Sequence, residues 1–194
     1  VMVDDIDAGG SSSSPNNLTN VGGMLFFTAP DGSHGSELWE SDGTSAGTQL
    51  VDDIYPGSSS SFPANLTNVG GTLFFTANDG PHGIELWESN GTSTGTQLVD
   101  DIVSGSGSAS ILNPTAVGNL LFFSANDGTH GTELWESDGT SSGTVLVDDI
   151  AAGTTSSSPT NLTNVGGTLF FSANDATHGT ELWTSDGTST GTVL

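Results

Sequence analysis

Residues 120–150, LLFFSANDGTHGTELWESDGTSSGTVLVDDI, decide the fold of this chain. Two turn-like segments that contain Asp-Gly separate three apolar segments within it. An Asp side chain can bond the backbone amides of its own turn, and Gly adopts the positive φ that tight turns require. The stretch therefore predicts three short β-strands joined by two hairpin turns.

The same stretch returns with a fixed period of 48 residues. We place the repeats at 1–48, 49–96, 97–144 and 145–194, within a single repeat domain. A period in this range indicates a propeller, a solenoid or an array, in which no unit buries its apolar face alone. Each repeat carries one tryptophan and one histidine at equivalent places: Trp39, Trp87, Trp135 and Trp183, and His34, His82, His130 and His178.

A further strand precedes this pattern in each repeat. Spacers rich in Ser, Gly and Pro link the repeats, and NLTNVGG follows three of them, starting at Asn17, Asn65 and Asn161. The third repeat has PTAVGN there instead. A Gly-containing turn between two apolar segments is typical of a tight hairpin. Each repeat is therefore expected to form four short strands, which indicates an all-β protein.

Bulky apolar residues stand next to each other in these strands, as in Leu73-Phe74-Phe75 and Leu86-Trp87. Neighbouring residues of a strand point to opposite faces, so both faces of each sheet need to be covered. Radially packed propeller blades meet this need. We predict a four-bladed β-propeller with one four-stranded blade per repeat. The alternative is an open stack of the same units within a longer array.

The charge of the chain excludes several partners. It has no Lys or Arg, 23 acidic residues and a net charge of −23. Nothing in it neutralises phosphate, so neither nucleic acid nor an anionic membrane is an expected partner. Self-repulsion at this charge predicts a medium rich in salt or divalent cations. The chain begins with Val, so we expect a processed product or a piece of a longer polypeptide.

Calcium is the cofactor that this composition favours. Hard cations prefer several oxygen ligands, and the recurring VDDI segment supplies paired carboxylates. No EF-hand loop or nonapeptide calcium repeat is present. The candidate ligands are Asp4, Asp5, Asp52, Asp53, Asp100, Asp101, Asp148 and Asp149.

The string E-L-W-x-x-D-G-T recurs at residues 37–44, 133–140 and 181–188, and Asn90 replaces its Asp in the second repeat. This string resembles the ELWxxDGT repeat family of secreted microbial proteins, over the whole chain. The resemblance implies a propeller-like protein that is extracellular or on the cell surface, and it carries no catalytic residues across. The Asp-Gly turn is also similar to the Asp-box turn of sialidase-type propellers, in which the Asp is structural.

The remaining candidates each have two interpretations. The four tryptophans could stack on a sugar, but their position between apolar residues in a strand favours core packing. The four histidines could contact a sugar or a metal, but each is expected to be a surface residue of a turn. Four sequons make N-glycosylation possible, or are a by-product of repeat amplification. Their asparagines are Asn17, Asn65, Asn90 and Asn161.

These features predict a non-enzymatic, extracellular structural or adhesive module whose partners are copies of itself. The last strand is divided between the chain ends, so strand sharing could build a filament or a surface layer. The residues concerned are Val1, Met2, Val3, Val193 and Leu194. The alternative is a multivalent lectin with one glycan site per blade, made by the tryptophans or histidines. A sialidase-like hydrolase would need a cationic clamp, which a chain without Lys or Arg lacks.

Overall fold

The computed structural model describes residues 2–194; the self-association candidate Val1 lies outside the described residues. The described chain is all-β, with fifteen strands and two single-turn 3₁₀ helices. The first two sheets contain β1 (Asn16–Val21), β2 (Met24–Ala29), β3 (Glu37–Ser41) and β4 (Gln49–Asp52), and β5 (Ala64–Val69), β6 (Thr72–Asn78), β7 (Ile84–Ser89) and β8 (Gln97–Asp100). The other two contain β9 (Leu112–Val117), β10 (Leu120–Asn126), β11 (Thr132–Ser137) and β12 (Val145–Asp148), and β13 (Thr160–Val165), β14 (Thr168–Asn174) and β15 (Thr180–Ser185). The 3₁₀ turns η1 (Ser93–Gly95) and η2 (Ser141–Gly143) precede β8 and β12.

Each sheet is an antiparallel meander whose strands pair in chain order. The prediction of four short strands per repeat is confirmed for the first three sheets. The fourth sheet has three strands and one isolated bridge between Thr184 and Val193. The last strands β4, β8 and β12 begin at positions 49, 97 and 145, so each belongs to the sheet of the preceding sequence repeat.

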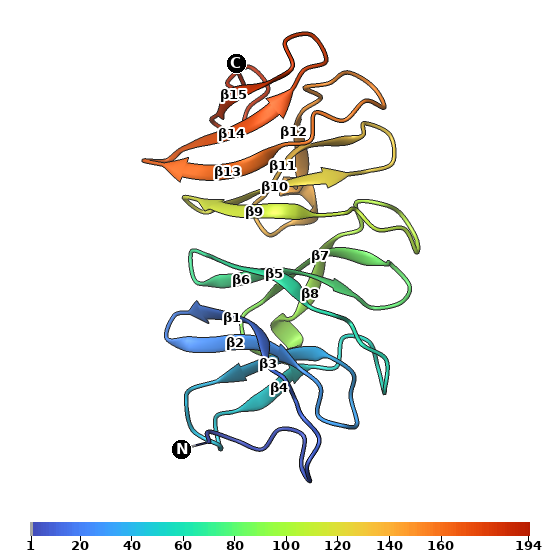
Figure 1. Ribbon diagram of the computed structural model, residues 1–194, viewed down its shortest axis with the longest axis vertical. Coiled ribbons are helices and arrows are strands. Elements are labelled where there is room, and N and C mark those ends of the chain that lie inside the picture. Colours follow the sequence, from blue (N-terminus) through green and yellow to red (C-terminus); the bar gives the residue numbers. More distant parts are fainter. Residues whose placement is uncertain (1) are drawn as a thin grey trace.

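The four sheets are stacked along the longest axis, and the two chain ends lie at opposite ends of the stack (Figure 1). Strands β1, β5, β9 and β13 lie side by side from one sheet to the next. The all-β repeat architecture is therefore confirmed. The described chain shows no closed ring, so the four-bladed propeller and the open stack within a longer array both stay predictions.

The hairpin turns follow from their residues. Gly22 and Gly23 both have positive φ, 60° and 95°, between β1 and β2. Two successive positive φ values are what a two-residue turn with the twist of the flanking strands requires. Asn20 Oδ1 accepts the N–H of Gly23 at 3.0 Å, which fixes the turn. The same bond recurs in the second and fourth sheets.

Both faces of each inner sheet are buried, as the adjacent apolar residues predict. In β6, Leu73 and Phe75 pack toward the first sheet, and Phe74 packs toward the third. Each junction between successive sheets therefore has its own apolar core. The core of the first junction contains Val21, Phe26, Leu38 and Val51 from one side and Ile54, Leu73, Phe75, Ala77 and Trp87 from the other. No helix among residues 2–194 is long and apolar enough to cross a membrane.

Candidate functional site: the junctions between repeats

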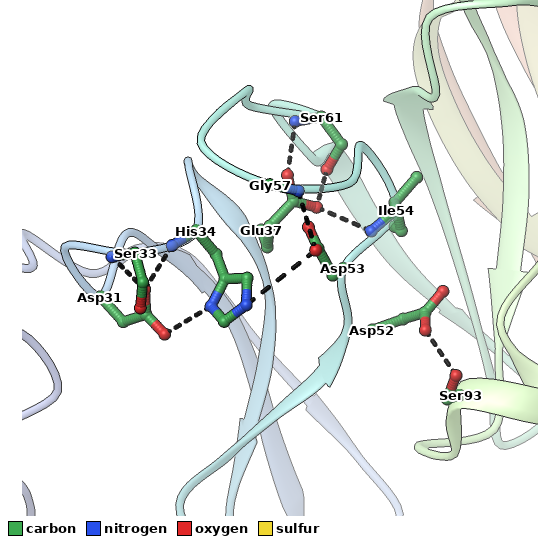
Figure 2. Close-up of polar contacts among 10 residues, drawn as sticks. All are labelled: Asp31, Ser33, His34, Glu37, Asp52, Asp53, Ile54, Gly57, Ser61 and Ser93. Carbon is green, nitrogen blue, oxygen red and sulfur yellow. Dashed lines mark hydrogen bonds and ion pairs between the residues drawn. The ribbon is translucent and has the colours of Figure 1, made fainter.

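A buried glutamate ties each sheet to the segment that leads into the next one. Glu37, in β3, is fully buried, and its carboxylate accepts the N–H of Ser61 at 2.7 Å and that of Ile54 at 3.2 Å. The Ser61 hydroxyl also donates to it (Figure 2). Glu133 makes the same three bonds with Ile150 and Ser157. We call Glu37, Glu85 and Glu133 the junction glutamates.

The second junction lacks one of these bonds. Ala109 stands where Ser61 and Ser157 stand in the other two, so no hydroxyl reaches Glu85. Its carboxylate accepts the N–H groups of Ile102 and Val103 at 3.2 and 3.4 Å. Burial raises the pKa of all three junction glutamates because it disfavours the charged form, and it raises the pKa of Glu85 to about 8.

The first aspartate of each VDDI segment, at the end of the last strand of a sheet, bonds a serine hydroxyl of the following sheet. Ser93 donates to Asp52 at 2.5 Å, and Ser141 donates to Asp100 at 2.5 Å. Ser189 bonds Asp148 in the same way. At the beginning of the chain, Ser45 donates to Asp4 at 2.6 Å, so the N-terminal segment is held on the first sheet as the end of β4 is held on the second.

The second aspartate of each VDDI segment bonds its own loop. Asp53 Oδ2 accepts the N–H of Gly57 at 3.0 Å, while Asp53 Oδ1 is buried without a hydrogen-bond partner among the described residues. Asp101 and Asp149 repeat this arrangement. Within residues 2–194, no three His, Asp or Glu side chains come together in a way that could hold a metal ion. Calcium binding by these aspartates stays a prediction.

The histidines lie in surface turns, each bonded to an aspartate three residues earlier. Asp31 Oδ2 lies 2.7 Å from His34 Nδ1, and Asp31 Oδ1 accepts the His34 N–H at 2.7 Å. Desolvation raises the pKa of Asp31, but the bonds from His34 and Ser33 outweigh it and lower the pKa to about 2. The bond to Asp31 raises the pKa of His34. Its other nitrogen, Nε2, lies 3.9 Å from Asp53 Oδ2 (Figure 2).

The tryptophans are core residues. All four are 7–9% exposed, and each packs in an apolar cluster. Their burial leaves no ring face for stacking on a sugar, so it argues against Trp39, Trp87, Trp135 and Trp183 as glycan contacts. Of the sugar-contact candidates, only the histidines reach the surface.

The sequon asparagines take part in the junctions. Asn17 Nδ2 donates to the carbonyl of Pro63 at 3.0 Å, and Asn65 Nδ2 donates to that of Ile111 at 3.1 Å. A glycan on either nitrogen would compete with these contacts. Asn161 makes no bond of this kind to another repeat within the described chain, and Asn90 Oδ1 accepts the Thr92 N–H in its turn. Glycosylation of these asparagines stays a prediction.

The two outer faces of the stack are each half of a junction. On the N-terminal face, Ile6, Leu25 and Phe27 line an apolar cavity of about 420 Å³ and pack with the buried Trp39. The C-terminal face carries Val165, Phe170, Glu181 and Leu182. Of these, Val165 and Leu182 are 57% and 64% exposed. The candidate functional surface is therefore the pair of outer faces.

The junction glutamates were not found from the sequence. A charged residue at the start of the ELW segment is expected to face solvent, because charged side chains are rarely fully buried. A usable signal existed, since Ser61 and Ser157 follow Glu37 and Glu133 by the same 24 residues.

No family model and no curated protein matches the chain. Several solved structures have a similar fold. A structure of puromycin hydrolase has a TM-score of 0.58 and 16% sequence identity over 86% of this chain and 26% of that chain. A puromycin hydrolase mutant complexed with PGG has a TM-score of 0.57 and 16% identity, with 85% and 25% covered. A puromycin-hydrolyzing peptidase of Mycobacterium tuberculosis has a TM-score of 0.50 and 12% identity, with 89% and 29% covered.

This comparison corrects one prediction. The expectation of a non-enzymatic protein is wrong by this comparison, because the structures that share the fold belong to hydrolases and a peptidase. The chain spans about a quarter of the length of those proteins. At 16% identity the likeness shows the fold, and the sequence identity is too low to carry over the activity.

Proposed function

We propose that this chain is an extracellular structural or adhesive module that assembles with copies of itself by sharing strands. The supporting observation is the edge of β15. In the first sheet, β3 pairs with β4 at three positions, including Leu38 opposite Asp52. In the fourth sheet the equivalent pairing is reduced to the bridge between Thr184 and Val193. Among residues 2–194, no strand pairs with β15 beside Leu182, so this edge can accept another strand.

An edge of this kind favours association. Unpaired N–H and C=O groups on an edge strand are a template for a strand from another chain. Because the two outer faces differ, the contact would be head to tail. Such contacts close into a ring when the rotation between copies allows it, and otherwise build a filament.

Charge sets the conditions for assembly. Each copy carries a net charge of −23, so bringing copies together is opposed by repulsion that salt screens. Divalent cations would reduce it further by neutralising carboxylates. A saline or calcium-containing extracellular medium is therefore the environment that we propose for the assembled state.

Sedimentation velocity and negative-stain electron microscopy test this proposal. We expect concentration-dependent oligomers in about 0.5 M salt, because this ionic strength shortens the screening length to a few Å and so weakens the repulsion between copies. Rings or filaments should be visible on grids, and a chelator should shift the population toward monomers if calcium takes part. A monomer at every concentration and salt level would contradict self-association.

The fold likeness supports a second candidate. The chain aligns over 86% of its length with part of puromycin hydrolase, so these repeats could form one segment of a larger hydrolytic enzyme. Release of the amino acid from puromycin, measured with this chain and with any longer polypeptide that contains it, tests this candidate. Turnover by the longer polypeptide would favour it over the structural module.

A further inference from the structure

The internal junctions have the same apolar residues on each side of their cores. From the preceding sheet, the first junction takes two valines, a phenylalanine and a leucine: Val21, Phe26, Leu38 and Val51. The third junction takes the equivalent set, Val117, Phe122, Leu134 and Val147. From the following sheet both take an isoleucine, a leucine, a phenylalanine, an alanine and a tryptophan. We call these the donor half and the acceptor half of a junction core.

Among residues 2–194, the N-terminal face is an acceptor half on which no donor half packs. Phe27, Ala29 and Trp39 form a core cluster there, with Ile6 and Leu25 packed against it. These five residues are equivalent to the acceptor residues of the first junction, 48 positions later. Three of the five, Ile6, Leu25 and Phe27, line the apolar cavity of about 420 Å³, where a donor half would sit.

The C-terminal face is a donor half on which none of residues 2–194 packs as an acceptor half. Val165, Phe170 and Leu182 are equivalent to Val117, Phe122 and Leu134. The fourth member of each internal donor half is the valine of VDDI, and the remaining equivalent of this valine is Val3, on the N-terminal segment. Val3 is 48% exposed. A docked second copy would therefore bring both an acceptor half and the missing valine.

In the internal junctions, the phenylalanine of the donor half packs against a glycine of the acceptor sheet. A Cβ on Gly91 would lie 3.4 Å from the ring of Phe26, and a Cβ on Gly139 would lie 3.2 Å from that of Phe74. Gly43, the equivalent residue of the first repeat, has open space at this position and lines the N-terminal cavity. Within the described residues, no ring lies beside Gly43 as Phe26 does beside Gly91 and Phe74 beside Gly139.

One difference between the repeats favours docking by the C-terminal face. In the internal junctions a carboxylate also lies against the glycine: Glu40 Oε2 would be 2.6 Å from a Cβ on Gly91. Glu136 Oε2, in the third junction, is buried without a hydrogen-bond partner among the described residues. The fourth repeat has Thr184 at this place. A junction made by the C-terminal face would therefore bury one carboxylate fewer, which lowers the desolvation cost.

We propose that the C-terminal face of one copy docks on the N-terminal face of a second copy as a fourth junction. Phe170 enters the cavity beside the second copy's Gly43. Glu181, which is exposed, becomes a junction glutamate and accepts the N–H groups of Ile6 and Ser13 of the second copy. Those residues are the equivalents of Ile54 and Ser61, which bond Glu37. This inference rests on the proposed self-association and names its interface.

A disulfide trap tests the register, because the chain has no cysteine. Leu38 and Asp52 are opposed across β3 and β4, so Leu182 and the second copy's Asp4 should be opposed in the same way. Opposed residues in an antiparallel pair lie about 4.5–5.5 Å apart at Cα, within reach of a disulfide. A mixture of L182C and D4C should form a covalent heterodimer with oxidised glutathione. A mixture of L182C and T129C, in an exposed turn, should not.

Matched truncations test the contribution of the apolar contact. Leu182→Ala should weaken association at least about tenfold, as loss of a buried leucine side chain does. Leu112→Ala is the control, because Leu112 is a strand leucine of similar exposure, 55% against 64%, that lies outside both faces. A monomeric wild type would overturn both proposals. An associating wild type with no L182C–D4C heterodimer and equal effects of the two truncations would overturn this interface alone.

Discussion

The third and fourth sheets have nearly the same sequence and very different surroundings. Residues 130–140 read HGTELWESDGT and residues 178–188 read HGTELWTSDGT. Glu133 is fully buried and holds Ser157, whereas Glu181 is exposed. Leu134 is 0% exposed and Leu182 is 64% exposed. The role of a residue in this protein is therefore set by whether a neighbouring sheet covers it, because each repeat supplies only half of a core.

The largest difference should appear when the two leucines are truncated. Leu134→Ala should lower the free energy of unfolding by about 3 kcal/mol, because it leaves a cavity in a closed junction. Leu182→Ala should change that of the monomer by less than about 0.5 kcal/mol, as surface substitutions do. Urea unfolding followed by the buried tryptophans measures both. Equal losses would mean that the C-terminal face is covered within the monomer.

The period and turn chemistry made much of the fold predictable. The Asp-Gly turns form as expected, since Asp138 Oδ1 accepts the N–H of Thr140 and Gly139 has a φ of 91°. The apolar neighbours in Leu73-Phe74-Phe75 correctly predicted burial on two faces. Ring closure was not predictable in the same way, because it depends on a small rotation between sheets that no single residue pattern encodes. The junction glutamates were missed because their hydrogen-bond partners lie 17 to 24 residues away.

The second junction should make stability depend on pH. Burial raises the pKa of Glu85 to about 8, above its unfolded value near 4.5. The folded state therefore binds this proton more tightly, and the stabilisation is fully present below about pH 4.5 and is lost as the pH rises through about 8. Glu85→Gln should make the fall in unfolding free energy shallower between about pH 5 and pH 9, an interval that contains the folded pKa of about 8. Glu181→Gln, at the exposed equivalent position, should leave the slope unchanged. The prediction fails if both variants have the wild-type slope.

A smaller effect is expected from restoring the missing hydroxyl. Ala109→Ser would place at Glu85 the donor that Ser61 provides to Glu37. A hydrogen bond to the charged carboxylate should add about 1 kcal/mol of stability at pH 9 and lower the pKa of Glu85. Chemical denaturation of the variant at pH 5 and pH 9 separates the two effects, with the larger gain expected at pH 9. A loss at both pH values would indicate that the buried site cannot accept the added oxygen.

The smallest expected difference is between the pKa values of two equivalent histidines, His34 in the first sheet's turn and His178 in the fourth. Bonds to Asp31 and Asp175 raise the pKa values of His34 and His178, and the charge of Asp53 adds to the effect on His34 alone. A raised pKa contributes stability that is present below the unfolded value of 6.5 and is lost as the pH rises through the folded value. Proton NMR titration should find both above 6.5. In an assembly, the second copy's Asp5 would stand beside His178 where Asp53 stands beside His34, so the pKa of His178 should rise on assembly. A His178 titration that is the same in monomer and assembly would place the contact between copies away from the C-terminal face.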